Sequence, residues 1–486
     1  MSKQLGVELH ERYAIFRVWA PFAQAAAVLG DFSNWQPIEM TKDDVDGVWE
    51  AKVKGAEPGQ AYRYKIKGFD GNDRYNNDPR ALAVTDSDEG NSVIADNIFD
   101  WEDFDEIKLA PKDQQVLYEV HIGTFMRPDP ATPGTFQTAI EKLDYLKSLG
   151  VTTLELMPVT SMAMSYGWGY APSYLYSVEN SYGGSYGYKN FIKEAHKRGL
   201  AVVMDVVYNH FSNQTAPWQF DGWSTNNRGG IYFYNDDRGD TPWGSRPDYG
   251  RQEVRDFILD NVTMWLTDYH VDGFRLDSTI YMRNTMGLNN DPSHDIPDAW
   301  RLMMDISDTV HKIKPDALVI AEDCSGNSQI TNGTAYGGAG FDCQWDLGLP
   351  HVIRGALHVG NEPTGLQNLI SVQAHTFNGD WHQRVVFSDS HDTAANGNER
   401  LVSTVVPDTH SVDARRIAIL GSAIALTTPG IPMLLAGSEF MQGGTFNDWK
   451  ALDWENVDKF GGIIEAHRHL IALRNNQYGD TAGLMS

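Results

Sequence analysis

The first hundred residues carry short runs in which apolar and polar positions alternate. Two such runs, at 13–32 and 47–68, are bounded by turns rich in Gly, Pro, Asn and Asp. A period of two is typical of strands that bury one face. The pattern therefore predicts a small N-terminal β-sandwich over residues 1–100, joined by an acidic linker at 101–115.

From residue 116 the pattern changes to apolar runs that alternate with amphipathic segments. Segments such as 135–150, 251–270 and 461–476 show the apolar spacing of helices. The apolar runs predict strands at 116–125, 151–159, 201–210, 271–279, 317–323, 340–348, 384–392 and 431–440. Eight strands followed by helices predict a (β/α)8 TIM barrel, and thus an α/β fold, over residues 116–486.

Two segments depart from this regular alternation. Residues 211–250 follow the third strand and are too long for an ordinary loop, so we expect a small inserted subdomain over the barrel mouth. The most apolar run, 417–437, is interrupted by Pro429 and Pro432. It predicts a buried helix followed by a buried strand, and no membrane span.

Composition and charge narrow the class of protein. The chain has 486 residues, of which 41% are hydrophobic and 21% charged, as is ordinary for a soluble protein. A net charge of −26 argues against nucleic acid or an anionic membrane as partner, because phosphate binding needs clustered Lys and Arg. Two cysteines make no disulfide framework, and the N-terminus lacks a secretory h-region, so we expect a cytoplasmic protein.

Polar residues gather at the ends of the predicted barrel strands, where the active sites of such barrels lie. A single Asp there is more often a helix N-cap than a catalyst, and Asp205 is alternatively a buried carboxylate bonded to Arg275. Helix capping does not explain why several strands place such residues at the same end of the barrel. The residues concerned are Asp205, Asn209 and His210, then Arg275 and Asp277, then Glu322, and finally His391 and Asp392.

Arg275 and Asp277 stand two apart in an apolar strand, so both side chains point to one face. A metal centre could use the histidines and carboxylates, but Arg275 would place a fixed positive charge beside the metal. Retaining glycoside hydrolysis or transfer uses every charged group: one carboxylate attacks, a second acts as acid and then base, and the Arg keeps the nucleophile ionised. We favour the second chemistry and expect neither a metal nor a cofactor.

The segment 166–188 is dense in Tyr and Trp. Aromatic faces pack against sugar rings, which agrees with glycoside chemistry. Most of these rings are expected to be loop core. Trp168 and Tyr170 are the candidates for contact with substrate.

Four ordered motifs, "DVVYNH" (205–210), "GFRLDSTI" (273–280), "IAED" (320–323) and "SDSHDT" (388–393), resemble the signature regions of the α-amylase superfamily, glycoside hydrolase family 13. The resemblance implies that Asp277 is the nucleophile, Glu322 the general acid/base and Asp392 a stabiliser of the transition state. It further implies that the reacting sugar is surrounded by Arg275, His210, His391 and the stacking Tyr170, and that Asp205 is a structural Asp.

The segment 16–37 resembles the N-terminal sandwich of glycogen branching enzymes, debranching enzymes and maltooligosyl-trehalose trehalohydrolases. The segment 117–125, followed by 168–170, resembles both branching enzymes and trehalohydrolases. The segments 232–255 and 385–401 look closer to bacterial branching enzymes, which implies transfer of α-glucan chains from α-1,4 to α-1,6 links. An α-glucan hydrolase or a non-catalytic glucan-binding protein are the alternatives, and the catalytic motifs do not separate transfer from hydrolysis.

Two features depart from the branching-enzyme pattern. Thr393 stands where many branching enzymes carry an acidic or amide residue. The chain ends at Ser486, directly after the last predicted barrel helix, so we expect the family's usual C-terminal β-sandwich to be absent.

Overall fold

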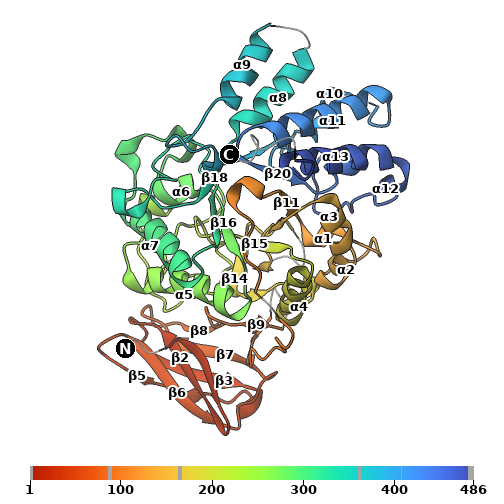
Figure 1. The fold of residues 1–486 in the computed structure, drawn as a ribbon. Coiled ribbons are helices and arrows are strands. Elements are labelled where there is room, and N and C mark those ends of the chain that lie inside the picture. Colours follow the sequence, from red (N-terminus) through yellow and green to blue (C-terminus); the bar gives the residue numbers. More distant parts are fainter. Residues whose placement is uncertain are drawn as a thin grey trace.

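A computed structural model describes residues 4–85, 90–104, 106–162, 167–359, 363–406 and 408–479. The expected N-terminal sandwich is confirmed, and it lies below the barrel in Figure 1. One sheet has the order β1 (Gly6–His10), β2 (Tyr13–Trp19), β6 (Val48–Lys54), β5 (Thr41–Lys42). The other has the order β4 (Ile38–Glu39), β3 (Ala25–Gly30), β7 (Ala61–Lys67), β10 (Ser92–Val93), β9 (Ala83–Val84), with β8 (Asp73–Asn76) paired to β7.

The predicted barrel is also confirmed, as a closed ring of parallel strands. Each strand is shorter than its apolar run; the fourth, for example, ends at Leu276, one residue before Asp277. Asp205 and Arg275 lie in the last residues of β15 and β16, whereas Asn209, His210, Asp277, Glu322, His391 and Asp392 follow the strands and lie in the loops. In ring order the strands are β11 (Leu117–Val120), β12 (Thr153–Leu156), β15 (Ala201–Val206), β16 (Gly273–Leu276), β17 (Leu318–Ala321), β18 (Cys343–Trp345), β19 (Arg384–Phe387) and β20 (Ile431–Leu435).

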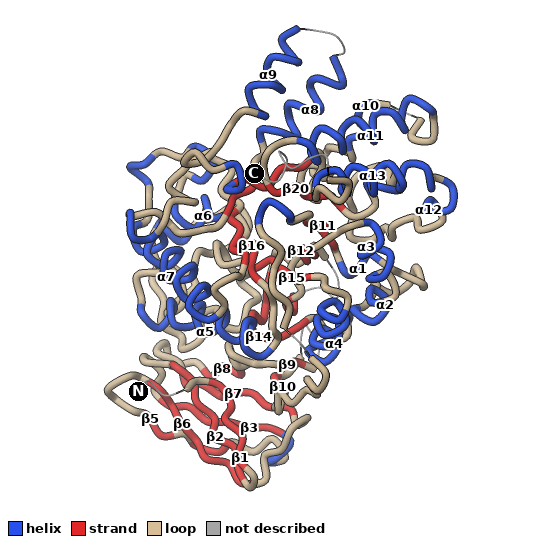
Figure 2. Tube along the Cα trace, in the orientation of Figure 1, coloured by secondary structure: helices blue, strands red, loops and turns tan. Residues whose placement is uncertain are grey.

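Helices surround the strands, as Figure 2 shows. The predicted helix at 135–150 is divided into α2 and α3, whereas 251–270 and 461–476 each hold one long helix. The helices are α1 (Ile122–Phe125), α2 (Phe136–Ile140), α3 (Leu143–Leu149), α4 (Gly184–Lys197), α5 (Gln252–Asp268), α6 (Thr279–Arg283), α7 (Pro297–Ile313), α8 (Gly348–Val359), α9 (Pro363–Gln373), α10 (Leu401–Val405), α11 (Val412–Thr427), α12 (Asn456–Lys459) and α13 (Gly461–Arg474).

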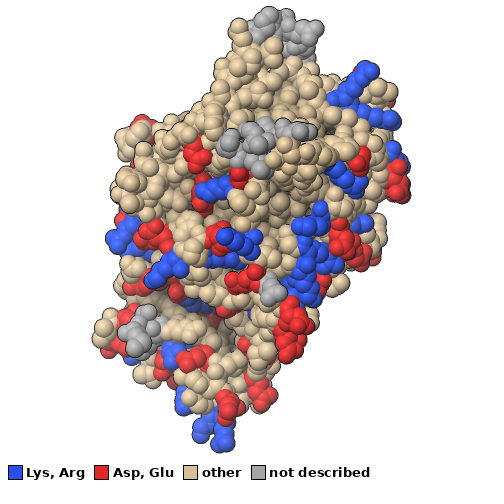
Figure 3. All heavy atoms as spheres, in the orientation of Figure 1, with Lys and Arg blue, Asp and Glu red and all other residues tan. Residues whose placement is uncertain are grey.

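The apolar run 417–437 forms the end of α11 and the buried strand β20, as predicted. Across the described ranges, none of the helices combines the length and apolarity that crossing a bilayer requires. On the face drawn in Figure 3, Asp and Glu side chains are interspersed with Lys and Arg over both sandwich and barrel. The acidic excess is therefore not gathered into a single patch on this face.

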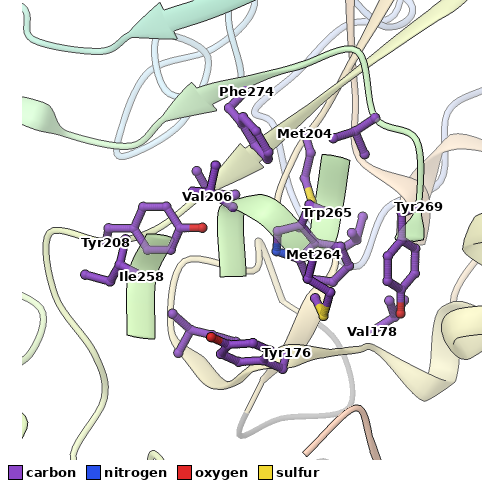
Figure 4. Packing of buried hydrophobic residues seen from close by; sticks show 14 of the residues in the cluster. Tyr176, Val178, Met204, Val206, Tyr208, Ile258, Met264, Trp265, Tyr269 and Phe274 are labelled. Carbon is purple, nitrogen blue, oxygen red and sulfur yellow. The ribbon is translucent and has the colours of Figure 1, made fainter. Parts of the chain in front are cut away.

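A dense apolar layer fixes the strands that carry the site. Met204 and Val206 of β15 and Phe274 of β16 pack toward Trp265 of α5, and all four are buried (Figure 4). Tyr176, from β14 (Pro172–Val178), which pairs with β13 (Thr160–Met162), closes the layer. Burying one large side chain contributes about 1.5–3 kcal/mol, so this layer holds the ends of β15 and β16 firmly in place.

The insertion at 211–250 is largely irregular and has its own aromatic core, which includes the buried rings of Phe220, Tyr232 and Phe233. The ring of Tyr232 lies 5.3 Å from that of Trp19 in the sandwich. Asp221 accepts a hydrogen bond from the backbone N–H of Phe22 at 3.0 Å. The insertion therefore connects the sandwich to the mouth of the barrel.

Candidate active site

A pocket of about 670 Å³ opens at the carboxyl ends of the barrel strands. Loops after five different strands bring predicted site residues to its wall, because parallel strands in a closed barrel all end at the same rim. The predicted residues that line it are Trp168, Tyr170, His210, Asp277, Glu322, His391 and Asp392.

Arg275 lies beneath the wall and is 1% exposed. Its Nη1 donates to Asp205 Oδ2 at 2.6 Å and to Asp277 Oδ1 at 3.0 Å, and its Nη2 lies 2.8 Å from Glu322 Oε2. The pairing of Arg275 with Asp277 that the strand pattern predicts is present. One guanidinium thus pairs with three carboxylates.

Asp277 is held at both carboxylate oxygens. Arg275 donates to Oδ1, and the Nδ2 amide of Asn209 donates to Oδ2 at 2.6 Å. The backbone N–H of Asp277 continues the ladder to Val206 O at 2.9 Å. Asn209 was visible in sequence as a polar residue at a strand end, but its role as a partner of Asp277 was not. These donors aim one carboxylate into the pocket with little freedom to rotate.

Glu322 has the surroundings of a general acid. Its Oε2 accepts from the backbone N–H of Ser278 at 2.8 Å as well as facing Arg275. Burial raises the pKa of Glu322 to about 8, and the neighbouring carboxylates of Asp277 and Asp392 push in the same direction, against Arg275. At neutral pH this side chain therefore carries a proton, which Oε1 is placed to donate because Oε2 accepts two contacts.

Asp205, for which the resemblance implies a structural role, does not line the pocket. Its Oδ2 accepts from the Tyr170 hydroxyl at 2.7 Å and from Arg275, so it supports the pocket wall from below. Burial raises its pKa to about 7. The ring of Tyr170 is stacked on that of His391, with centroids 5.1 Å apart. Asp205 thus reaches the substrate pocket only through Tyr170 and Arg275.

The aromatic and histidine side chains complete the wall. Burial lowers the pKa of His210, whose ring lies 5.6 Å from that of Trp243. Trp243 comes from the insertion, and the centroid of its ring also lies 4.9 Å from that of the Tyr281 ring. The sequence marked the insertion as rich in Trp but did not single out this residue. Tyr166 of the aromatic segment lies outside the described residues.

Other wall residues were not expected from the sequence. Asn396 Nδ2 donates to Asp392 Oδ1 at 3.1 Å and so orients that carboxylate. Cys324 is half-buried and lines the pocket, and burial raises the pKa of its thiol, which keeps it protonated. The remaining unexpected wall residues include Ile280, Leu288, Leu347 and Asp448.

Comparison with known proteins agrees with this geometry. The family model "Alpha amylase, catalytic domain" matches residues 119–248 and 221–462. The chain belongs to the α-amylase family. A second model, carbohydrate-binding module 48 (isoamylase N-terminal domain), matches residues 4–81, which form most of the sandwich. The protein is accordingly a glycosidase or transglycosidase of the α-amylase family with a module of this type at its N-terminus.

Individual relatives divide among several activities. The chain is 32% identical to a malto-oligosyltrehalose trehalohydrolase of Saccharolobus solfataricus, over 95% of this chain and 79% of that protein. It is 29% identical to a 1,4-alpha-glucan branching enzyme of Nocardia farcinica, over 97% of this chain and 64% of that enzyme. It thus spans somewhat less than two thirds of that branching enzyme.

Among solved structures, the fold is similar to that of a type I pullulanase from Bacillus subtilis complexed with maltose. That match has a TM-score of 0.79 and 22% identity, and it covers 98% of this chain and 72% of the pullulanase. A pullulanase from Paenibacillus barengoltzii, complexed with maltohexaose and alpha-cyclodextrin, has a TM-score of 0.78, with 24% identity over 98% of this chain and 81% of its own. At these identities the structures establish the shared fold.

Proposed function

We propose that this chain is a retaining α-glucan transglycosidase, namely a 1,4-α-glucan branching enzyme. The observation that carries the proposal is the single buried guanidinium of Arg275, which bonds to Asp277 and faces Glu322 in one pocket. Burial raises the pKa of Glu322 to about 8, so Glu322 holds a proton beside Asp277, as the acid of a retaining mechanism must. Branching enzymes among the relatives support the choice of activity.

In the first half of the reaction, Asp277 attacks the anomeric carbon of an α-1,4 bond. The bond from that carbon to the leaving oxygen breaks, and Glu322 gives its proton to this oxygen. The products are a glycosyl ester on Asp277, an ionised Glu322 and a released chain end. Asp392, which lines the same pocket, stabilises the positive charge that develops on the sugar ring.

In the second half, Glu322 takes the proton of an acceptor's 6-hydroxyl, whose oxygen attacks the anomeric carbon and frees Asp277. An α-1,6 link forms, and Glu322 is protonated again. Transfer to a sugar instead of water requires a wall that holds the acceptor and excludes solvent. Trp243, Tyr281 and Leu288 supply such an aromatic and aliphatic wall in the same pocket as Glu322.

Hydrolysis is the second candidate, because the trehalohydrolase relative is 32% identical to this chain over the aligned residues, against 29% for the branching enzyme of Nocardia farcinica. In that case water replaces the 6-hydroxyl in the second half of the reaction. The same carboxylates act, and the chain would release trehalose from malto-oligosyltrehalose.

The deciding experiment is proton NMR of amylose incubated with the protein, with reducing ends assayed in parallel. New α-1,6 anomeric signal without matching growth in reducing ends is expected. A rise in reducing ends, or trehalose released from malto-oligosyltrehalose in a separate incubation, without α-1,6 signal would overturn branching in favour of hydrolysis. The variant Asp277→Ala serves as the inactive control in every incubation.

A further inference from the structure

We propose that Glu119 is a positioning residue that holds His391 as an imidazolium directed into the pocket. This inference deepens the proposed function, on which its catalytic consequence rests. Glu119 lies on β11 and His391 follows β19, 272 residues later in the chain. Both side chains are buried. No sequence motif joins them.

The contact between the two residues is bidentate. Glu119 Oε1 lies 2.5 Å from the ring Nδ1 of His391, and Oε2 accepts from the His391 backbone N–H at 2.8 Å. One carboxylate therefore fixes both the loop backbone and the ring. With Nδ1 facing a carboxylate, the second ring nitrogen, Nε2, is the one left to serve the pocket that His391 lines.

The charges that face His391 favour its protonated form. Burial and the Arg275 charge lower the pKa of His391, but the Glu119 carboxylate, with Asp392, leaves the pKa raised above that of an ordinary histidine. Both ring nitrogens are then donors, so Nε2 presents an N–H to a sugar hydroxyl. The other titratable or charged groups near His391 are Arg275 from β16, Asp392 on its own loop, His121 after β11 and the stacked Tyr170, and Arg400 and Glu155 face Glu119.

Glu155 provides a matched neighbour. It lies on β12 directly opposite Glu119 in the parallel register, and it is equally buried. Its Oε2 has no hydrogen-bond partner among the described residues. Burial, with Glu119 beside it, raises the pKa of Glu155 well above its ordinary value, which favours its protonated form. Of these two adjacent glutamates, only Glu119 faces the ring of His391.

Glu119→Gln removes the charge while keeping the shape, and Glu155→Gln replaces a neutral acid with a neutral amide at the opposite position. We would titrate the histidine rings of ¹⁵N-labelled protein by NMR and assign the His391 signal with His391→Gln. In Glu119→Gln the pKa of His391 is expected to fall, because burial and Arg275 then oppose the charged ring and only Asp392 still favours it. The rate kcat/KM on amylose is expected to fall about 10- to 100-fold, as for a lost hydrogen bond to a charged group.

Glu155→Gln is expected to leave the His391 titration and the rate unchanged, and Glu119→Asp is expected to restore part of the raised pKa. An unaltered His391 titration in Glu119→Gln, or equal effects of the two Gln variants, would overturn the proposal. Because the titration needs no turnover, it separates this inference from branching. If the titration shifts as expected but no α-1,6 links form, the positioning role stands and the proposed function fails.

Discussion

The two ends of strand β16 both carry buried charges, but the charges are balanced differently. At its start, Asp272 is fully buried and accepts from Lys314 Nζ at 2.6 Å and from the backbone N–H of Val202 at 2.8 Å, and His196 Nε2 lies at 2.7 Å. One carboxylate there has a surplus of donors. At the other end, one guanidinium serves three carboxylates beside a pocket.

This difference separates a structural cluster from a chemical one. Where every buried charge is matched, the protonation states are fixed and the cluster only stabilises the fold. Where carboxylates outnumber cations beside a pocket, protonation can change, and burial, with the charge of Asp277 added to it, raises the pKa of both Glu322 and Asp205. In this protein, burial alone does not mark a charge cluster as catalytic. The catalytic cluster is the one that has more carboxylates than cations and that borders the pocket.

The largest expected effect is at the unbalanced end. Asp277→Ala removes the proposed nucleophile and should reduce glucan turnover by about 10⁴-fold or more, as removal of a covalent nucleophile does in other enzymes. The fold should persist, because Asp277 makes its side-chain contacts at the pocket wall. Initial rates on amylose and a circular-dichroism melt measure the two outcomes. Substantial residual activity would contradict the assignment of the nucleophile.

Glu322→Gln should lower the rate by about 10² to 10⁴-fold, the range for a lost general acid. In the wild type, activity should decline as pH rises through about 8, because the pKa of Glu322 is raised to about 8 and the acid loses its proton there. A pH–rate profile of the wild type measures where this decline in activity occurs. A limb that lies near the ordinary pKa of Glu would show that Glu322 is not the acid.

The same raised pKa also affects stability. The folded state binds the Glu322 proton more tightly than the unfolded state, so this stabilisation is complete below pH 4.5 and is lost as pH rises through about 8. Unfolding free energy measured in urea should therefore fall over that range in the wild type and fall less steeply in Glu322→Gln. Asp205, with a pKa of about 7, should keep part of the slope in the variant.

At the balanced end the expected effect is on stability and not on rate. Asp272→Asn leaves Lys314 buried without its carboxylate and should lower the free energy of unfolding by about 3–5 kcal/mol. The kcat of the folded enzyme should stay within about twofold of the wild type. A large loss of kcat without a loss of stability would show that the two ends of β16 are not separate in function.

The smallest expected effect is at the rim. Trp243→Ala removes an exposed ring from the pocket wall and should lower the ratio of transfer to hydrolysis by about 3- to 10-fold, the scale of one aromatic contact. Tyr336→Ala is the matched control, because Tyr336 is 82% exposed and does not belong to the pocket wall. An unchanged ratio of transfer to hydrolysis in the Trp243 variant would show that this ring does not hold the acceptor.

Local residue patterns were enough to predict the order of the elements and the end of the barrel at which the active site lies. Apolar periodicity sets strands and helices locally, and the ends of parallel barrel strands always meet at one rim, so Asp277, Glu322 and Asp392 were expected to converge. The charge pair at 275 and 277 was also readable, because side chains two apart on a strand share a face.

Only the tertiary structure decided which partner each of these groups has. Glu119 and His391 are 272 residues apart, and Trp243 reaches the pocket through an irregular insertion that has no periodicity to read. The raised pKa of Glu322 depends on burial and on nearby carboxylates from other strands. Such effects arise from distance and solvent exclusion in three dimensions, which no local pattern of residues encodes.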